Sequence, residues 1–370
     1  HRAGEVDWSP YVDRLFSGLL RMLNLPVGSG NLPQLQPSSA TLDLEVFFDP
    51  AVWEQMEPSM TSEMAKLCVW MLDSTGRTQR ILTNLVQYIE PFYHPSQKGS
   101  WSPKLATFLF SLCLQFSKRI RFQRLNTVAG SSRVIPPSFI LSEEQIKQFV
   151  LMANPIIDKA QYSKSSSVAL AANQCAMCLS FITPELVLPQ MLERIFPALT
   201  TLTETHQTNS ALQILGRIYR PLVATALSYP TGPLNISHAM FAALPGIDPN
   251  DQMKTASTLR FFTQLLNQIP LIECRSLPDD ATEAERAAMQ MTAMFPEWCS
   301  SVLEKIFSVF TSSTESEKST DMEQAIGGMI NEFGLTFFQQ MSPEIYSFSL
   351  NKLLDFVSNN LLTNVAKQVG

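Results

Sequence analysis

Cysteine and histidine are the residues best suited to metal binding or catalysis in this chain of 370 residues. Their spacing indicates that they pack in the core and do not form such a site. Cys175 and Cys178 form a C-x-x-C pair. A zinc site would need two more ligands at suitable spacing, and only His206 lies nearby in sequence. Two small apolar residues one helical turn apart are the simpler interpretation. The four histidines form neither an H-E-x-x-H motif nor a catalytic triad.

Acidic and glycine-rich motifs give no catalytic constellation either. The acid pairs at 143–144 and 279–280 fall in predicted loops or first helical turns, where carboxylates favour the helix dipole. No G-x-G-x-x-G or Walker-type loop is present. We therefore expect that the protein is not an enzyme and has no catalytic residue, cofactor or metal ligand in this chain.

One basic cluster stands out, and it consists of Lys118, Arg119, Arg121 and Arg124. These residues close a predicted helix, where cations complement the helix dipole. The sharper alternative is a site for an anion, such as a phosphate-rich ligand or an acidic protein surface. A net charge of −6 argues against broad binding to nucleic acid.

Helical periodicity runs through almost the whole sequence. Apolar residues recur at three- and four-residue spacing in segments such as 102–124, 259–269, 326–337 and 350–357. In the last segment the stripe is Leu350, Leu353, Leu354 and Val357. The segments Ser142–Gln145 and Thr282–Glu285 fit the capping box, and Ser102, Thr183 and Ser342 each precede a proline as N-cap candidates.

The order of these helices predicts the fold class. Residues 168–182 and 185–202 form a helix pair of the HEAT type, although no regular repeat period is found. We expect an all-α protein, a single α-solenoid segment of degenerate HEAT-like pairs over residues 1–370. It would be part of a longer chain, with a Pro/Gly/Ser-rich loop near 26–49. A multi-helix globular domain is the alternative.

A corner at residues 243–251 separates two of the predicted helices. Its two prolines fix φ, and Gly246 permits a tight bend. Asp248 or Asn250 is expected to cap the following helix. The scattered cysteines suit reduced thiols of an intracellular protein, and the uncharged stretch 165–184 is polar enough to be a buried helix instead of a membrane span.

The segment 189–274 resembles a known family. The residues that carry the resemblance are 192–207, 244–251 and 269–274, with support from 92–101 and 277–286. They are similar to the large single-chain proteasome activators of the HEAT-repeat type, in the part called the proteasome-substrate-size regulator mid region. The family includes the animal activator and its yeast counterpart, which is linked to bleomycin sensitivity.

This resemblance implies a partner more than a chemistry. Such activators cap the α-ring of the 20S core particle, open its gate and regulate substrate entry, independently of ATP and ubiquitin. The resemblance also implies a role in DNA repair, a location in nucleus and cytoplasm, and degradation of acetylated histones through regions outside this chain. No membrane or direct nucleic-acid partner is expected. Inositol phosphates bind full-length family members, and Lys118, Arg119, Arg121 and Arg124 are chemically suitable for them. A different HEAT-type scaffold, such as a transport receptor or assembly factor, is the alternative.

Overall fold

The computed structural model describes residues 8, 10–25, 59–97, 99–127, 135–200, 205–226, 228–313 and 321–369. Every regular element in these ranges is a helix, and the only β-type contact among them is one isolated bridge between Leu271 and Met341. The prediction of an all-α fold is confirmed. The loop expected near 26–49 lies outside the described residues.

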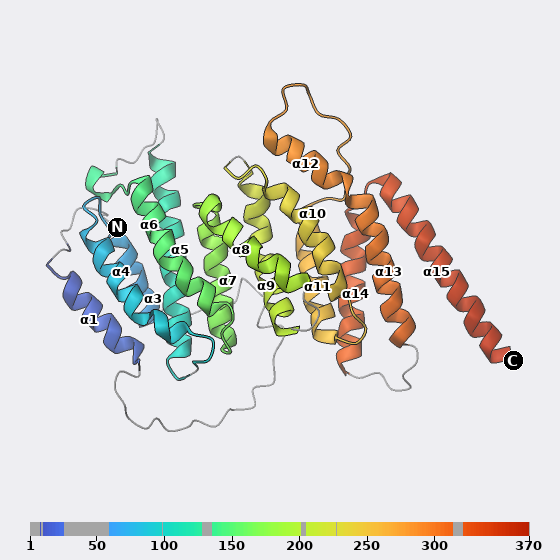
Figure 1. The fold of residues 1–370 in the computed structure, drawn as a ribbon, viewed down its shortest axis with the longest axis horizontal. Helices are drawn as coiled ribbons and strands as arrows, with labels where there is room; N and C mark the ends of the chain where they lie inside the picture. The colour runs from blue at the N-terminus through green and yellow to red at the C-terminus, as the bar shows by residue number, and fades with distance from the viewer. Residues whose placement is uncertain are drawn as a thin grey trace. The chain divides into compact units, whose positions relative to one another are not determined.

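The chain divides into two compact units, His1–Val187 and Leu188–Gly370. Figure 1 labels the helices of both units. α8 (Pro184–Thr200) crosses the boundary. Each unit is a set of packed helices with its own core. The prediction of one continuous solenoid segment therefore stays a prediction, and the units are described separately below.

Unit 1 is built around one long helix. Its helices are α1 (Val12–Leu23), α3 (Met60–Trp70), α4 (Arg77–Ile89), η1 (Glu90–Tyr93), α5 (Ser102–Asn126), η2 (Pro137–Phe139), α6 (Glu143–Ala160) and α7 (Ser166–Ser180). α5 packs against α3 on one side and α7 on the other, while α4 and α6 pack together beside them. The predicted α5 stripe is buried throughout, at Leu105, Phe108, Leu109, Leu112, Phe116 and Ile120.

In unit 2, as in unit 1, one helix packs against two others. Its helices are α9 (Thr205–Ala224), α10 (Gly232–Ala243), η3 (Leu244–Gly246), α11 (Gln252–Leu266), α12 (Glu283–Ala293), α13 (Phe295–Ser313), α14 (Asp321–Gln339) and α15 (Pro343–Val369). α11 packs between α9 and α14, α10 contacts α12, and α13 contacts α15.

Aromatic rings form the centre of unit 2. Trp298 is fully buried, and its ring lies edge-on to Phe262 at a centroid distance of 5.0 Å. Its indole N–H donates to the Met240 carbonyl at 3.1 Å, so its one polar group is satisfied. Phe333 and Phe337 of α14 stack at 5.2 Å on the same cluster. This core holds α11, α13 and α14 in place.

Helix starts largely follow the sequence signals. The capping boxes at Ser142 and Thr282 have both of their reciprocal hydrogen bonds. The Ser342 hydroxyl accepts from the Ile345 N–H at 3.4 Å. Ser102 is not an N-cap, because the helix begins there and Trp101 occupies the cap position. Thr183 precedes α8 as expected, but its buried hydroxyl has no hydrogen-bond partner.

Candidate functional site

The C-x-x-C cysteines lie inside unit 1. Cys175 and Cys178 are buried on α7, and the Cys175 thiol donates to the Leu109 carbonyl at 3.4 Å. Burial raises the pKa of Cys178 to about 12 and the pKa of Cys175 well above its ordinary value. Within the described ranges no three His, Cys, Asp or Glu side chains gather in a way that could hold a metal. These thiols are protonated at neutral pH and pack as small apolar groups.

Three of the four predicted cations lie at the surface of α5. Lys118 and Arg121 are exposed. The Arg124 guanidinium contacts a Glu143 carboxylate oxygen at 3.4 Å and donates to the Ile182 carbonyl at 3.3 Å. Arg124 thus ties the C-terminal part of α5 to the start of α6. Anion binding by these three residues stays a prediction.

Arg119 lies in the core and not at the surface with the other three cations, so the prediction that it belongs to a surface anion site is wrong. Its side chain is fully buried, and its guanidinium donates to the carbonyls of Val69 at 2.5 Å, Leu72 at 2.7 Å and Phe139 at 2.8 Å. The guanidinium also lies 4.0 Å from the centroid of the Phe139 ring. Burial lowers the pKa of Arg119 to about 9, which leaves it charged at neutral pH. Arg119 therefore links α3, α5 and η2 and is not accessible to a surface anion.

The corner between α10 and α11 is confirmed, but its cap is not the expected one. Asp251 is the N-cap of α11, and its carboxylate accepts from the Lys254 N–H at 2.9 Å. Asp248 accepts instead from the Asn250 N–H at 2.9 Å, within the corner itself. The Asp248 carboxylate also lies 3.4 Å from the buried Lys254 ammonium. Burial alone would raise the pKa of Asp248, but the bonds from Asn250 and Lys254 outweigh it, so the pKa is lowered.

Gly246 is needed for close approach. A Cβ at this position would lie 2.1 Å from the Thr258 hydroxyl oxygen of α11. Thr255 of α11 also binds the corner. Its hydroxyl accepts a hydrogen bond from the Asp248 N–H at 2.9 Å and donates one to the Asp248 carbonyl at 2.8 Å. The corner therefore fixes η3 against α11, which is a structural role.

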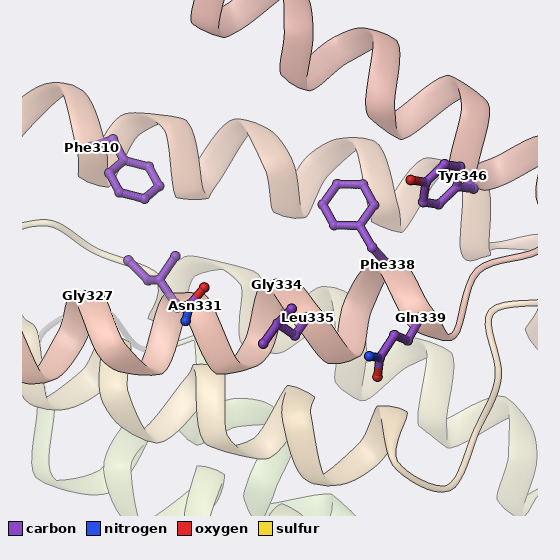
Figure 2. Close-up of a pocket in the computed structure, with 9 residues that line it drawn as sticks. Phe310, Gly327, Asn331, Gly334, Leu335, Phe338, Gln339 and Tyr346 are labelled. Carbon is purple, nitrogen blue, oxygen red and sulfur yellow. The ribbon is translucent and has the colours of Figure 1, made fainter.

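An apolar groove of about 610 Å³ opens in unit 2 between α13, α14 and α15 (Figure 2). It is lined by Phe310, Gly327, Ile330, Asn331, Gly334, Leu335, Phe338, Gln339 and Tyr346. None of these side chains is charged. Leu335 is 58% exposed and Phe310 is 46% exposed, so large apolar groups face the solvent here. The rings of Phe338 and Tyr346 meet edge-on at 5.8 Å and join α14 to α15 at one end of the groove.

The apolar stripe predicted on α15 is helical but is not buried in this structure. Leu354 is 53% exposed and Val357 is 42% exposed, while Leu350 and Leu353 are only half-buried. The other side of α15 packs on α13, where the rings of Phe356 and Phe307 stack at 3.9 Å. The spacing therefore predicts the helix correctly, while the side chains of the stripe are half-buried or exposed among the described residues.

Comparison with known proteins gives the family. The family model described as "Proteasome activator complex subunit 4, mid HEAT repeats region" matches residues 82–283 and 276–370. This chain belongs to the proteasome activator complex subunit 4 family. It is 32% identical to that protein from Homo sapiens over 98% of this chain, and 31% identical to the one from Xenopus laevis over 97%. Proteasome activator subunit 4 of Arabidopsis thaliana is 26% identical over 99% of the chain.

The chain spans about a fifth of the length of these relatives, from 19% to 20%. It corresponds to the mid HEAT-repeat region of that family. No helix within the described ranges has the length and apolar character required to cross a membrane.

The apolar groove between α13, α14 and α15 was not predicted from the sequence. A second stripe on α14, through Gly327, Asn331, Gly334 and Phe338 at helical spacing, was the signal that could have revealed it.

Proposed function

We propose that this chain is a structural HEAT-repeat segment of a proteasome activator that caps the 20S core particle, opens its gate and regulates substrate entry. The observation that carries the proposal is the alignment with proteins named proteasome activator complex subunit 4 over 97–98% of the chain. In this view the segment shapes and rigidifies the activator and carries out no reaction itself.

The chemistry of the described residues supports a structural role. The buried thiols Cys68, Cys178 and Cys299 have pKa values raised to about 12 by burial, so they are poor nucleophiles at neutral pH. The deeply buried Arg119 binds backbone carbonyls of its own unit. The Arg119 hydrogen bonds therefore hold elements of unit 1 to one another.

The test uses the full-length protein that contains this segment. Purified 20S core particle would be assayed for hydrolysis of a fluorogenic peptide with and without that protein, and the two would be co-sedimented in parallel. We expect faster hydrolysis and co-sedimentation, each of which depends on the concentration of the full-length protein. A protein that is folded by circular dichroism but neither binds nor stimulates the core particle would refute the proposal.

We also propose weak inositol-phosphate binding at Lys118, Arg121 and Arg124, the accessible part of the basic cluster. Three neighbouring cations attract phosphate groups, although the C-terminal end of a helix opposes anions. Titration calorimetry of the full-length protein with inositol hexakisphosphate would compare the triple alanine variant with a variant lacking the exposed Arg77 and Arg80 of α4. Equal affinity in both variants would make the α5 cluster an ordinary solvated surface.

A further inference from the structure

We propose that Arg217, Arg220 and Arg260, here called the arginine cluster, bind one small oxyanion such as inorganic phosphate or a carboxylate. The anion would join α9 to α11 within unit 2 by accepting hydrogen bonds from guanidinium groups on both helices. The inference does not depend on proteasome activation or on the basic cluster of α5. It rests on the burial of Arg217, on its lack of a partner among the described residues, and on the arginines beside it.

Arg217 is a buried cation whose charge the fold does not compensate. It is 9% exposed, and it makes no hydrogen bond or ion pair with the residues that the structure describes. Arg119 of unit 1 is also buried, but its guanidinium donates to three backbone carbonyls. A buried charge is costly unless hydrogen bonds or an opposite charge compensate it. Arg217 therefore needs an acceptor that the described residues do not supply.

The packing of α9 on α11 brings Arg217 next to a second arginine. A Cβ at Gly216 of α9 would lie 3.0 Å from the side-chain oxygen of Gln264 on α11. Arg260 precedes Gln264 by one helical turn, so it lies on the same side of α11. Burial first, and then the charge of Arg217, lower the pKa of Arg260 to about 10. The two guanidinium groups therefore repel each other across the contact between the two helices.

Arg220 adds a third cation to this cluster. It is exposed and follows Arg217 by one helical turn. Burial first, and then the charge of Arg220, lower the pKa of Arg217. The Arg220 Nε–H donates to the Tyr219 hydroxyl at 3.0 Å, which uses one of its five N–H groups. Glu332 of α14 is a carboxylate that raises the pKa of Arg260, but three cations beside one carboxylate leave an excess of positive charge.

The chemistry of the arginine cluster selects a small oxyanion. A guanidinium presents paired N–H donors that match two oxygens of a carboxylate or a phosphate. One such group between α9 and α11 would neutralise the buried charge of Arg217 and offset the cost of its burial. The ligand must be small to reach Arg217, because that side chain is buried. The exposed Glu332 repels anions of high charge.

The test is amide hydrogen exchange, followed by mass spectrometry, of the full-length protein in phosphate and in chloride at equal pH and ionic strength. A bound anion favours the folded state by a factor of one plus its concentration divided by its dissociation constant. At a phosphate concentration about ten times that constant, we expect amides of α9 and α11 to exchange about tenfold more slowly than in chloride. Slower exchange in acetate as well would identify a carboxylate ligand, whereas an effect of phosphate alone would identify a tetrahedral oxyanion.

Two variants connect this response to the arginine cluster. Arg217→Gln should abolish the effect of phosphate, while Arg286→Gln, which removes an exposed arginine of α12, should retain it. In chloride, Arg217→Gln should exchange no faster than the wild type, because it removes a buried charge without breaking a hydrogen bond. Faster exchange of Arg217→Gln in both salts, by an equal factor, would make Arg217 a structural residue and overturn the proposal.

Arg260→Gln keeps the test decisive if Arg217→Gln misfolds, since Arg260 is half-buried and its loss should also abolish the effect of phosphate. Equal exchange of the wild type in phosphate, acetate and chloride would overturn the proposal. An undiminished phosphate effect in the folded Arg217 variant would do the same. Slower exchange with inositol hexakisphosphate, but with neither phosphate nor acetate, would assign the cluster to a polyanion and likewise overturn it.

Discussion

Replacing Arg119 with methionine tests the buried guanidinium that joins α3, α5 and η2. The change leaves the carbonyls of Leu72 and Phe139 without this donor, and each unsatisfied buried carbonyl costs about 1–3 kcal/mol. Methionine fills similar space and removes a charge that was costly to bury, which offsets part of the loss. We expect Arg119→Met to lower the free energy of unfolding of this region by about 2–4 kcal/mol.

Amide hydrogen exchange followed by mass spectrometry measures this loss of unfolding free energy separately for each helix. A loss of that size corresponds to exchange about 30- to 700-fold faster in α3 and η2, if these amides exchange through local opening. Arg121→Met is the matched control, because Arg121 is an exposed cation two residues away on the same helix and should change stability by less than about 0.5 kcal/mol. Unchanged protection in the Arg119 variant, or equal effects of both variants, would refute the structural role of the guanidinium.

Three further predictions concern the corner and the thiols. Gly246→Ala should destabilise the purified chain by about 1–3 kcal/mol in thermal unfolding, because a methyl there overlaps a buried hydroxyl. Gly328→Ala, where a Cβ meets nothing, should stabilise it by up to about 1 kcal/mol, and effects of the same sign would contradict this. N-ethylmaleimide at pH 7.5 should modify the half-exposed Cys274 and spare Cys178 until the protein unfolds, whereas equal labelling by mass spectrometry would count against the buried position. Asp248→Asn should cost up to about 1 kcal/mol at pH 7, since the lowered pKa means that the ionised carboxylate stabilises the fold. That difference should vanish as the pH falls below 3.8 and the wild-type carboxylate is protonated, and a difference that persists in acid denaturation curves would disprove it.

Local signals in the sequence were sufficient for the helices. The α5 stripe and the capping boxes depend on residues three or four apart, so they are readable without tertiary information. The cap of α11 was misassigned because Asp248, Asn250 and Asp251 have similar capping ability. The hydrogen bonds that distinguish them come from Thr255 and Lys254 in the folded corner.

Properties that depend on neighbouring helices were harder to predict. Arg119 lies three residues after the buried Phe116, so helical register was a signal for its burial. Its carbonyl partners lie 20 to 50 residues away in sequence, and no local pattern reveals them. The α15 stripe could be identified from its spacing, but its exposure depends on which helices are present beside it.

The bridge between Leu271 and Met341 has a consequence for the order of folding. The Leu271 N–H donates to the Gln340 carbonyl at 2.7 Å, and the Ser342 N–H donates to the Leu271 carbonyl at 3.0 Å. These two bonds close a loop that contains α12, α13 and α14, and the contact between Phe262 of α11 and Phe333 of α14 spans a similar stretch of sequence. Loop-closure entropy must be overcome before such distant contacts form. The helices of this segment should therefore form before the bridge, which makes its closure a late kinetic step in the assembly of unit 2.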